Sequence, residues 1–286
     1  MIGVILAGGH ASRFRPATKV TSKHLFPVFD KPAIYYPLAT LISSGINEIY
    51  IIVKPTDRNA FEALLGCGTQ FGVSISYCEQ IQPYGVPQAF SIVKKYIGKK
   101  PVVLILGDNI FVRPPPLNEP DDADDSIARI FGSYVTSPSS YGIAEVSDSG
   151  SILSLVEKPK FSKSNLAITG IYKFPPDVCN FVNMLKPSKR GELEIIDLLK
   201  LYNVEERVRV TTLSNEIGWF DTGTPNGLLE AGIFVREIQI QSKTFVGSPE
   251  LAAVHNGFVS ADQMISHLAR TSDSLYANAI VRLLKT

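Results

Sequence analysis

The sequence predicts an α/β fold: a Rossmann-like, doubly wound mixed sheet with helices on both faces, a β-rich insertion and a small C-terminal helical bundle. Two observations lead to this prediction. Short apolar runs rich in β-branched residues, at residues 2–6, 49–53 and 102–106, are typical of parallel strands buried on both faces. Helix-like stretches at residues 33–44 and 57–65 lie between these runs, and each is followed by a glycine, so strand and helix alternate along the chain.

The pattern changes after Asp108. A proline-rich and then acidic stretch over residues 113–125 predicts a solvated surface loop, because it lacks the spacing of an EF-hand. A denser, β-rich region follows, and helical patterns come after it. The strands are expected at residues 127–135, 143–146, 152–157 and 167–174, and the helices at residues 192–202, at residues 226–241 and from residue 248 on. This gives a core over residues 1–241 and accessory helices over residues 242–286.

The composition excludes several classes of function. The 28 lysines and arginines nearly balance the 27 aspartates and glutamates, so no overall field favours nucleic acid or an anionic membrane. No segment approaches the roughly 20 apolar residues that a spanning helix needs. The three cysteines are scattered, without the spacing of a metal site. We therefore expect a cytoplasmic protein that binds neither nucleic acid nor membrane, and whose anion sites are local.

A glycine-rich segment, LAGGHASRFRP at residues 6–16, follows the first predicted strand. Loop amides after such a strand can point at a phosphate where no β-carbon intervenes. The spacing matches neither GxGxxG nor GxxxxGK[ST], which disfavours a dinucleotide dehydrogenase and a P-loop enzyme. Arg13, Arg15, Lys19 and Lys23 follow, and such a set of cations suits a polyphosphate. Taken alone, the loop is equally consistent with a βα turn that carries solvated basic residues.

Acidic residues stand at the ends of other predicted strands. Asp108 follows VVLIL, Asp221 follows the only tryptophan and a phenylalanine, and Glu157 with Lys158 ends a third strand. Ligands of open α/β sheets bind at the carboxyl ends of strands, and Mg²⁺ usually takes one or two carboxylates. A turn role for Asp108 and an N-cap or turn role for Asp221 remain the alternatives.

Several motifs occur together and in a fixed order. LAGG and Arg13 are followed by Lys23, FPVFDKPAIYYPL, LGDNIF, EKP, RGELEI and WFDTGT. In these motifs the chain resembles the sugar-1-phosphate nucleotidylyltransferases over essentially its whole length, and most closely the branch that uses dTTP and glucose 1-phosphate.

The resemblance implies roles for individual residues. The nucleotide-binding residues would be Leu6, Ala7, Gly8, Gly9, Gln80, Pro83, Gly85 and Asp108. The catalytic residues would be Arg13, Lys23, Asp108 and Asp221, of which Asp108 and Asp221 would also bind magnesium. The sugar phosphate would contact Tyr141, Gly142, Glu157, Lys158, Thr169 and Arg190. The nucleotide-binding part would then span about residues 1–110 and the β-rich, sugar-binding part about residues 111–225.

The implied reaction is a Mg²⁺-assisted, in-line attack of glucose 1-phosphate on the α-phosphorus of dTTP, which gives dTDP-glucose and pyrophosphate for dTDP-sugar synthesis of the dTDP-rhamnose type. The resemblance also implies a homotetramer and a regulatory nucleotide site at a subunit interface, which no motif places. Two alternatives remain open: the same chemistry on another nucleotide or sugar phosphate, such as UTP, and a non-catalytic sugar-nucleotide sensor.

The glycine loop departs from the family pattern at Ala11, where relatives carry glycine. If this position needs a positive φ, alanine costs on the order of 1 kcal/mol or more, and if φ is negative little is lost. His10 and His24 lie near the loop, and for both we expect a surface or packing role, because the reaction requires no acid-base step from them.

Overall fold

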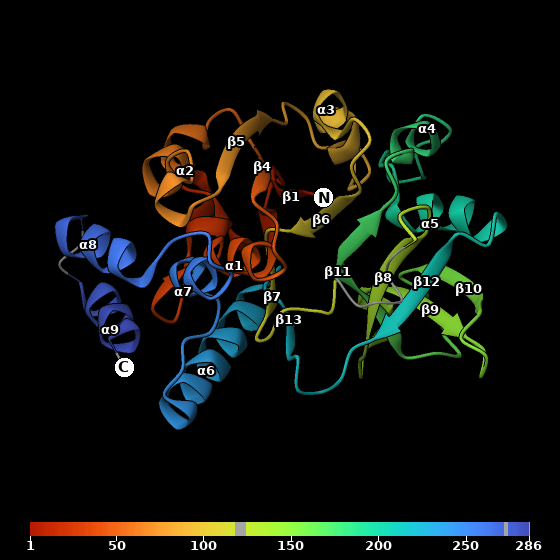
Figure 1. Cartoon of the computed structure of the whole chain (residues 1–286). Helices are drawn as coiled ribbons and strands as arrows, with labels where there is room; N and C mark the ends of the chain where they lie inside the picture. The colour runs from red at the N-terminus through yellow and green to blue at the C-terminus, as the bar shows by residue number, and fades with distance from the viewer. Residues whose placement is uncertain (118–123, 272–273, 286) are drawn as a thin grey trace.

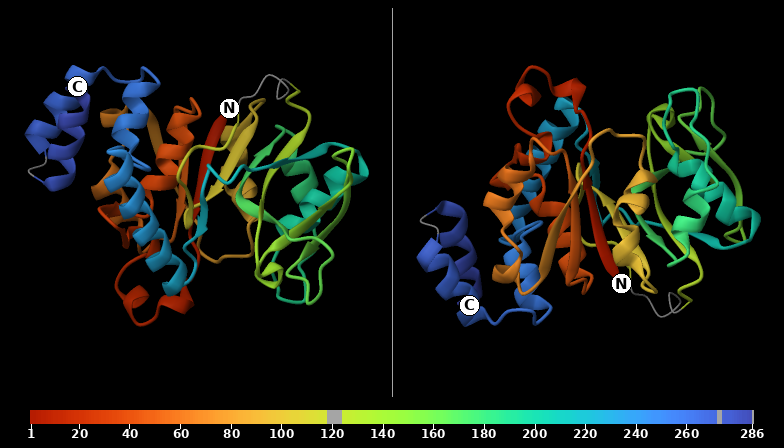
Figure 2. Two further views of the ribbon diagram at one scale, coloured as in Figure 1. Left: turned by 90° about the horizontal axis from the view of Figure 1, so that it is seen from below. Right: turned by 90° about the horizontal axis from the view of Figure 1, so that it is seen from above.

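The structure is a computed structural model that describes residues 1–117, 124–271 and 274–285. The middle of the predicted acidic loop, residues 118–123, lies outside the described residues. The β-rich insertion and the C-terminal helices lie at opposite ends of the molecule, and the first strand runs between them (Figures 1 and 2). The predicted mixed α/β sheet is confirmed, and its central part is parallel.

Four parallel strands form this central part. They are β1 (Ile2–Ala7), β4 (Glu48–Val53), β5 (Ser74–Glu79) and β6 (Val102–Leu106), with β1 between β4 and β6 and with β5 outside β4. Along β1, Ile5 points into one hydrophobic core and Val4 into the other, and both are fully buried. This alternation explains why the strand is apolar throughout, because each face of the sheet is covered.

Helices cover both faces of the sheet. The first is α1 (Tyr35–Ser43), the second α2 (Arg58–Leu65) and the third α3 (Gln88–Ile97). Most apolar residues of α1 and those of α2 belong to one core, and those of α3 belong to the other. Tyr36 of α1 instead belongs to a small third cluster with Ala231 and Val235 of the chain's later part. The helix at α2 ends at Gly66 as predicted, where φ is 55°. The sequence patterns did not predict β5 or the extent of α3.

The insertion joins the parallel part through β11 (Leu166–Phe174), which is antiparallel to β6. The other elements here are β8 (Ala128–Tyr134), β9 (Gly142–Val146), β10 (Ile152–Glu157), α4 (Val178–Val182), α5 (Ile195–Val204) and β12 (Val208–Thr212). The predicted strands are confirmed to within one residue at each end. The helix α5 starts three residues later than predicted, because the Leu193 amide instead donates to the Tyr84 carbonyl at 2.7 Å.

Two short ribbons lie outside the main sheet. In one, β7 (Asn109–Phe111) pairs with β13 (Trp219–Asp221), and in the other β2 (Pro27–Val28) pairs with β3 (Lys31–Pro32). The long helix α6 (Pro225–Ser242) follows β13. Its N-cap is Thr224, whose hydroxyl accepts from the Gly227 amide, so the N-cap alternative for Asp221 was wrong. The turn alternative is confirmed, because Asp221 Oδ1 accepts from the Gly223 amide at 2.8 Å.

The tail contains three helices, α7 (Pro249–His255), α8 (Ala261–Thr271) and α9 (Leu275–Leu284). Ala252 and Ala253 of α7 are buried in the same core as α1, so the tail is attached to the parallel part of the fold. The predicted helical tail is confirmed. In the part of the chain that the structure describes, no helix combines the length and the apolar character needed to cross a membrane.

Candidate active site

A cavity of about 510 Å³ opens at the carboxyl ends of β1 and β6. We refer to it as the first cavity. Of the predicted site residues, its walls bring together Leu6, Gly9, Arg13, Lys23, Gln80, Pro83, Gly85, Asp108 and Asp221. These residues come from four separate parts of the chain, and they meet where an open α/β sheet binds its ligands.

Glycines bring the loops of the first cavity close together. A β-carbon on Gly8 would lie only 2.2 Å from Oε1 of Gln80, so the glycine loop and the Gln80 loop touch. Gly85 has a φ of 101°, and a β-carbon there would lie 2.0 Å from the Leu193 carbonyl oxygen. The contact at Gly85 requires glycine, because a β-carbon there would meet backbone atoms, whereas a β-carbon at Gly8 would displace the Gln80 side chain.

Ala11 adopts the left-handed conformation, with φ 46° and ψ 41°. Its carbonyl is held in place, since it accepts from the Phe14 amide and from the Thr18 hydroxyl. Position 11 therefore has a backbone conformation that suits glycine, and alanine adopts it against its own steric preference.

We expect the substitution Ala11→Gly to raise the free energy of unfolding by about 1 kcal/mol, because glycine adopts a positive φ without the clash of a β-carbon. Urea denaturation followed by circular dichroism measures this change. The matched control is Ala60→Gly, at an exposed position inside α2. It should lower stability by about 1 kcal/mol. Equal losses in the two variants would contradict the assignment of strain to Ala11.

Arg13 is the unpaired cation of the first cavity. Its side chain is exposed and lines the cavity, and within the described ranges its guanidinium makes no hydrogen bond or ion pair. Its charge acts on Asp221, whose pKa it tends to lower. Because this arginine lines a cavity and has no protein partner, its guanidinium can bind an anion through bidentate hydrogen bonds.

Asp108 is held on both carboxylate oxygens. Lys23 Nζ donates to Oδ2 at 2.5 Å, and Asn109 Nδ2 donates to Oδ1 at 3.1 Å. Burial by itself would raise the pKa of Asp108. Neighbouring charges, that of Lys23 first, act together with the hydrogen bonds from Lys23 and Asn109 to outweigh burial, and they hold this pKa below its usual value. Asp108 is therefore a fixed, ionised carboxylate.

Asp221 faces Asp108 across a small space. Burial, followed by the negative charge of Asp108, raises the pKa of Asp221 above its usual value. A β-carbon on Gly223 would lie 2.8 Å from Oδ1 of Asp221 and 3.4 Å from Oδ2 of Asp108, so glycine keeps the space between the carboxylates open. The two carboxylates repel each other's negative charge, and a space lies open between them. This arrangement suits Mg²⁺, which takes one or two protein carboxylates and keeps several waters.

The ribbon of β7 and β13 brings the two acids together. Asp221 pairs with Asn109 across the ribbon, directly beside Asp108. Thr222 strengthens this link, because both its amide and its hydroxyl donate to the Asp108 carbonyl at 2.8 Å. Asn109 in turn accepts from Trp219 Nε1 at 2.6 Å and from the Gly170 amide at 3.0 Å.

A second cavity of about 890 Å³ lies against the insertion. Tyr141 and Lys158 line it, and Trp219 packs edge-on against Tyr141 with ring centroids 5.3 Å apart. Arg13 and Asp221 line both cavities, so the two cavities are adjacent and share these residues. Two ligands bound side by side would therefore meet next to the pair of carboxylates.

Four further predicted residues lie in the insertion. A β-carbon on Gly142 would lie 3.3 Å from Oε2 of Glu157, so these two are adjacent. Arg190 is bound by Glu194 at 2.7 Å and by Glu157 at 3.2 Å and is not on the wall of either cavity. Thr169 is fully buried, and its hydroxyl donates to the Phe131 carbonyl at 2.9 Å. The predicted sugar-phosphate roles of these four residues, like those of Tyr141 and Lys158, stay predictions.

His24 lies beneath the first cavity, as a packing role predicts. It is 3% exposed, and its Nδ1 shares a hydrogen bond of 3.0 Å with the Ser22 hydroxyl. Burial, with the positive charge of Lys23 adding to it, lowers the pKa of His24 to about 3. Because both members of this Ser-His pair are buried and neither lines the first cavity, the pair is not placed to attack a substrate there.

We expect His24 to make the metal-free protein less stable in acid. The unfolded chain takes up a proton at His24 near pH 6.5, whereas the native chain does so only near pH 3, so stability falls as the pH falls through that window. Titration of this one histidine changes the free energy of unfolding by at most about 1.4 kcal/mol per pH unit. Urea unfolding in EDTA should show a shallower pH dependence for His24→Gln than for the wild type. The exposed His255→Gln is the control, and equal slopes for wild type and His24→Gln would contradict this.

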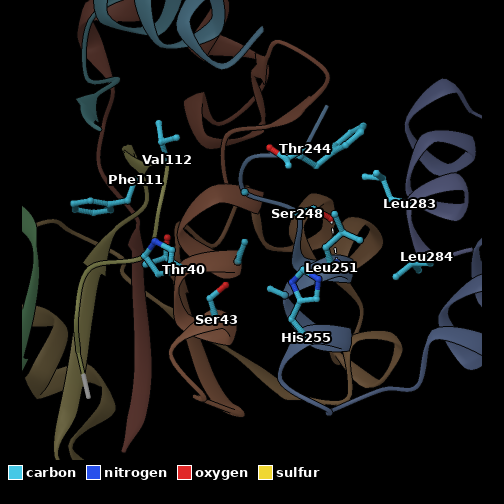
Figure 3. A pocket seen from close by; sticks show the side chains of 15 residues that line it. Thr40, Ser43, Phe111, Val112, Thr244, Ser248, Leu251, His255, Leu283 and Leu284 are labelled. Atoms are coloured by element: carbon cyan, nitrogen blue, oxygen red, sulfur yellow. Dashed lines mark hydrogen bonds between the residues drawn. The ribbon is translucent and has the colours of Figure 1, made fainter. Parts of the chain in front are cut away.

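A third cavity of about 320 Å³ lies between α1, α7 and the end of α9, where Thr40, Leu251, His255 and Leu284 face it (Figure 3). Among the described residues of its wall there is no lysine, arginine, aspartate or glutamate. It therefore lacks the cations that a triphosphate requires, and the first cavity is the better nucleotide site.

A family model described as nucleotidyl transferase matches residues 2–238. The chain belongs to this family. The resemblance inferred from the motifs is thus confirmed, and the nucleotidyl transferase match includes every predicted site residue.

Relatives within this family carry a more specific name. The chain is 42% identical to glucose-1-phosphate thymidylyltransferase of Mycolicibacterium smegmatis, with 99% of each chain covered. A solved structure assigned to the same enzyme, from Bacillus anthracis in complex with a sucrose, is 37% identical with a TM-score of 0.78, and covers 83% of this chain and 96% of that chain. UDP-glucose pyrophosphorylase complexed with UDP-glucose is 24% identical with a TM-score of 0.72, covers 83% of this chain and 99% of that chain, and shares the fold.

Sequence reasoning missed several residues on the cavity walls. Asn109 and Trp219 were visible only as parts of the GDN and WFD motifs, and their hydrogen bond could not be foreseen. Glu192 and Gly223 also line the first cavity. The one available signal for Gly223 was its place two residues after Asp221 in the WFDTGT motif, because glycine often marks a close approach of the backbone.

Proposed function

We propose that this nucleotidyl transferase joins dTTP and glucose 1-phosphate to give dTDP-glucose and pyrophosphate. The observation that carries the proposal is the meeting of the two cavities at Arg13 and Asp221, with Asp108 beside them. A nucleotide in the first cavity and a sugar phosphate in the second would place the α-phosphorus next to the incoming phosphate oxygen. The specific substrates follow from the relatives named glucose-1-phosphate thymidylyltransferase.

The residues present suit a displacement at phosphorus without a covalent enzyme intermediate. The attacking oxygen of a sugar phosphate is already ionised, so no side chain has to remove a proton from it. The chain has to hold two anions together, and that task falls to the unpaired Arg13 and to Lys158, with Lys23 fixing Asp108. Asp108 and Asp221 would hold Mg²⁺, which supplies charge neutralisation at the phosphates when bound.

The parts of the chain divide between the two substrates. Residues 1–110 with Gln80, Pro83 and Gly85 would hold the nucleotide, and residues 111–225 with Tyr141 and Lys158 would hold the sugar phosphate. Gly142, Glu157, Thr169 and Arg190 complete the sugar side in this proposal, and the chain would assemble as a homotetramer. Light scattering of the purified protein tests the assembly, and a monomer would contradict it.

Release of pyrophosphate tests the activity. The protein is incubated with glucose 1-phosphate, Mg²⁺ and either dTTP or UTP, and pyrophosphate is measured by a coupled assay. We expect release with dTTP that is lost on adding EDTA. A higher kcat/KM with UTP would change the nucleotide assignment. If the protein bound dTTP but released no pyrophosphate with any sugar phosphate of a panel, it would be a sensor and not an enzyme.

A further inference from the structure

The first cavity is short of positive charge for the ligand proposed for it. Arg13 and Lys23 are the permanent cations among its described wall residues, against three carboxylates, Asp108, Asp221 and Glu192. Lys23 is already paired with Asp108. A bound triphosphate adds further negative charge, so even with Mg²⁺ at the acids, Arg13 alone remains free for the phosphates.

His10 is placed to supply the missing charge. It belongs to the glycine loop, between Gly9 and Ala11, its side chain is exposed and it lines the first cavity. Within the described residues its imidazole has no hydrogen-bond or ion-pair partner, in contrast to the buried His24. The space beside it is open, because a β-carbon on Gly9 would meet no atom within 4 Å.

We infer that His10 binds the triphosphate of the nucleotide, and that its imidazolium form donates a hydrogen bond to a phosphate oxygen. This rests on the proposed function, because it requires a nucleoside triphosphate in the first cavity. Histidine changes its charge within the pH range of ordinary assays, unlike arginine or lysine. Nucleotide affinity therefore depends on pH through His10, and it is higher in mild acid.

The groups that share the cavity with His10 carry both signs of charge. Arg13 and Lys23 disfavour the imidazolium, whereas Asp108, Asp221 and Glu192 favour it. In this proposal the bound triphosphate lies against the imidazole, and its negative charge favours the protonated ring in the bound state. Proton uptake should accordingly accompany nucleotide binding.

The experiment measures the dissociation constant of dTTP with Mg²⁺ by calorimetry, without sugar phosphate, for the wild type, His10→Gln and His10→Lys. At about pH 6 we expect His10→Gln to bind about fivefold more weakly than the wild type, and at about pH 8.5 equally well. His10→Lys should match the wild type at the lower pH and exceed it at the higher. At each pH the dissociation constant of the variant is divided by that of the wild type, which cancels the effect of protonation of dTTP itself.

Two controls sharpen the result. His255→Gln, at an exposed position in the tail, should bind dTTP like the wild type at both pH values. Thymidine, which has no phosphates, should bind wild type and His10→Gln equally. Two outcomes would overturn the role of His10 and leave the proposed function intact. One is a ratio of dissociation constants, His10→Gln to wild type, that does not change with pH, and the other is an equal weakening of thymidine binding. If the wild type bound no dTTP, the proposed function would fail together with this inference.

Discussion

Replacing either Asp108 or Asp221 with asparagine is expected to reduce kcat by about a thousandfold or more, because a metal-assisted displacement depends on the charge at this site. Asparagine keeps the shape of the side chain but not its charge. At position 108 the change also leaves the ammonium of Lys23 without its partner at 2.5 Å. The fold should persist, since neither carboxylate belongs to the hydrophobic cores. Pyrophosphate release measures kcat, and circular dichroism melting checks the fold.

The matched control is Asp197→Asn, an aspartate with a side chain 43% exposed that pairs with Lys200 at 2.9 Å. Exposed ion pairs contribute little to stability, so this variant should keep full activity. Normal Mg²⁺-dependent turnover in either Asp108→Asn or Asp221→Asn would remove the metal assignment.

Replacing Arg13 with glutamine should lower kcat/KM for dTTP by about a hundredfold or more, since loss of one preorganised donor to a developing charge has effects of this size. Arg13 lines both cavities and has no other partner among the described residues, so its guanidinium is available to the phosphates, whereas Lys23 on the same wall is already paired with Asp108. Steady-state kinetics with dTTP varied at saturating glucose 1-phosphate gives the measurement.

Arg15→Gln provides the comparison, because Arg15 is exposed, lies two residues further along the same loop and is not on the wall of either cavity. We expect it to retain activity within about twofold, as for an exposed charge outside the site. Equal losses at positions 13 and 15 would indicate a general electrostatic effect of the loop and would contradict a specific role for Arg13.

The parallel core was predictable because its strands are buried on both faces. A continuous apolar run such as VVLIL at residues 102–106 predicts a buried strand even when the neighbouring strands are not known. By contrast, β5 lies at the edge of the sheet with one side exposed, so its sequence SISYCE gives no such run. The three-residue strands β7 and β13 are too short for any periodicity, and their pairing joins positions more than a hundred residues apart.

The candidate site was predictable in part for a related reason. Acids and cations at the ends of strands could be placed at one edge of the sheet from topology alone. The positions of Gln80, Thr169 and Arg190 came only from resemblance. Local hydrogen bonds, such as that of Thr169 to the Phe131 carbonyl, depend on the registers of neighbouring strands, which the sequence patterns do not specify. The conformation of Ala11 likewise required coordinates.

The ribbon of β7 and β13 also determines when the pair of acids can form during folding. It closes a loop that contains the whole insertion, and closing a longer loop costs more conformational entropy. Contacts between such distant parts of a chain are slow to form. A chain that has assembled only its parallel core therefore has a hydrophobic interior but no paired Asp108 and Asp221. Ligands that need both acids stabilise only the completed fold, so nucleotide with magnesium should protect the insertion and the core from unfolding as one unit.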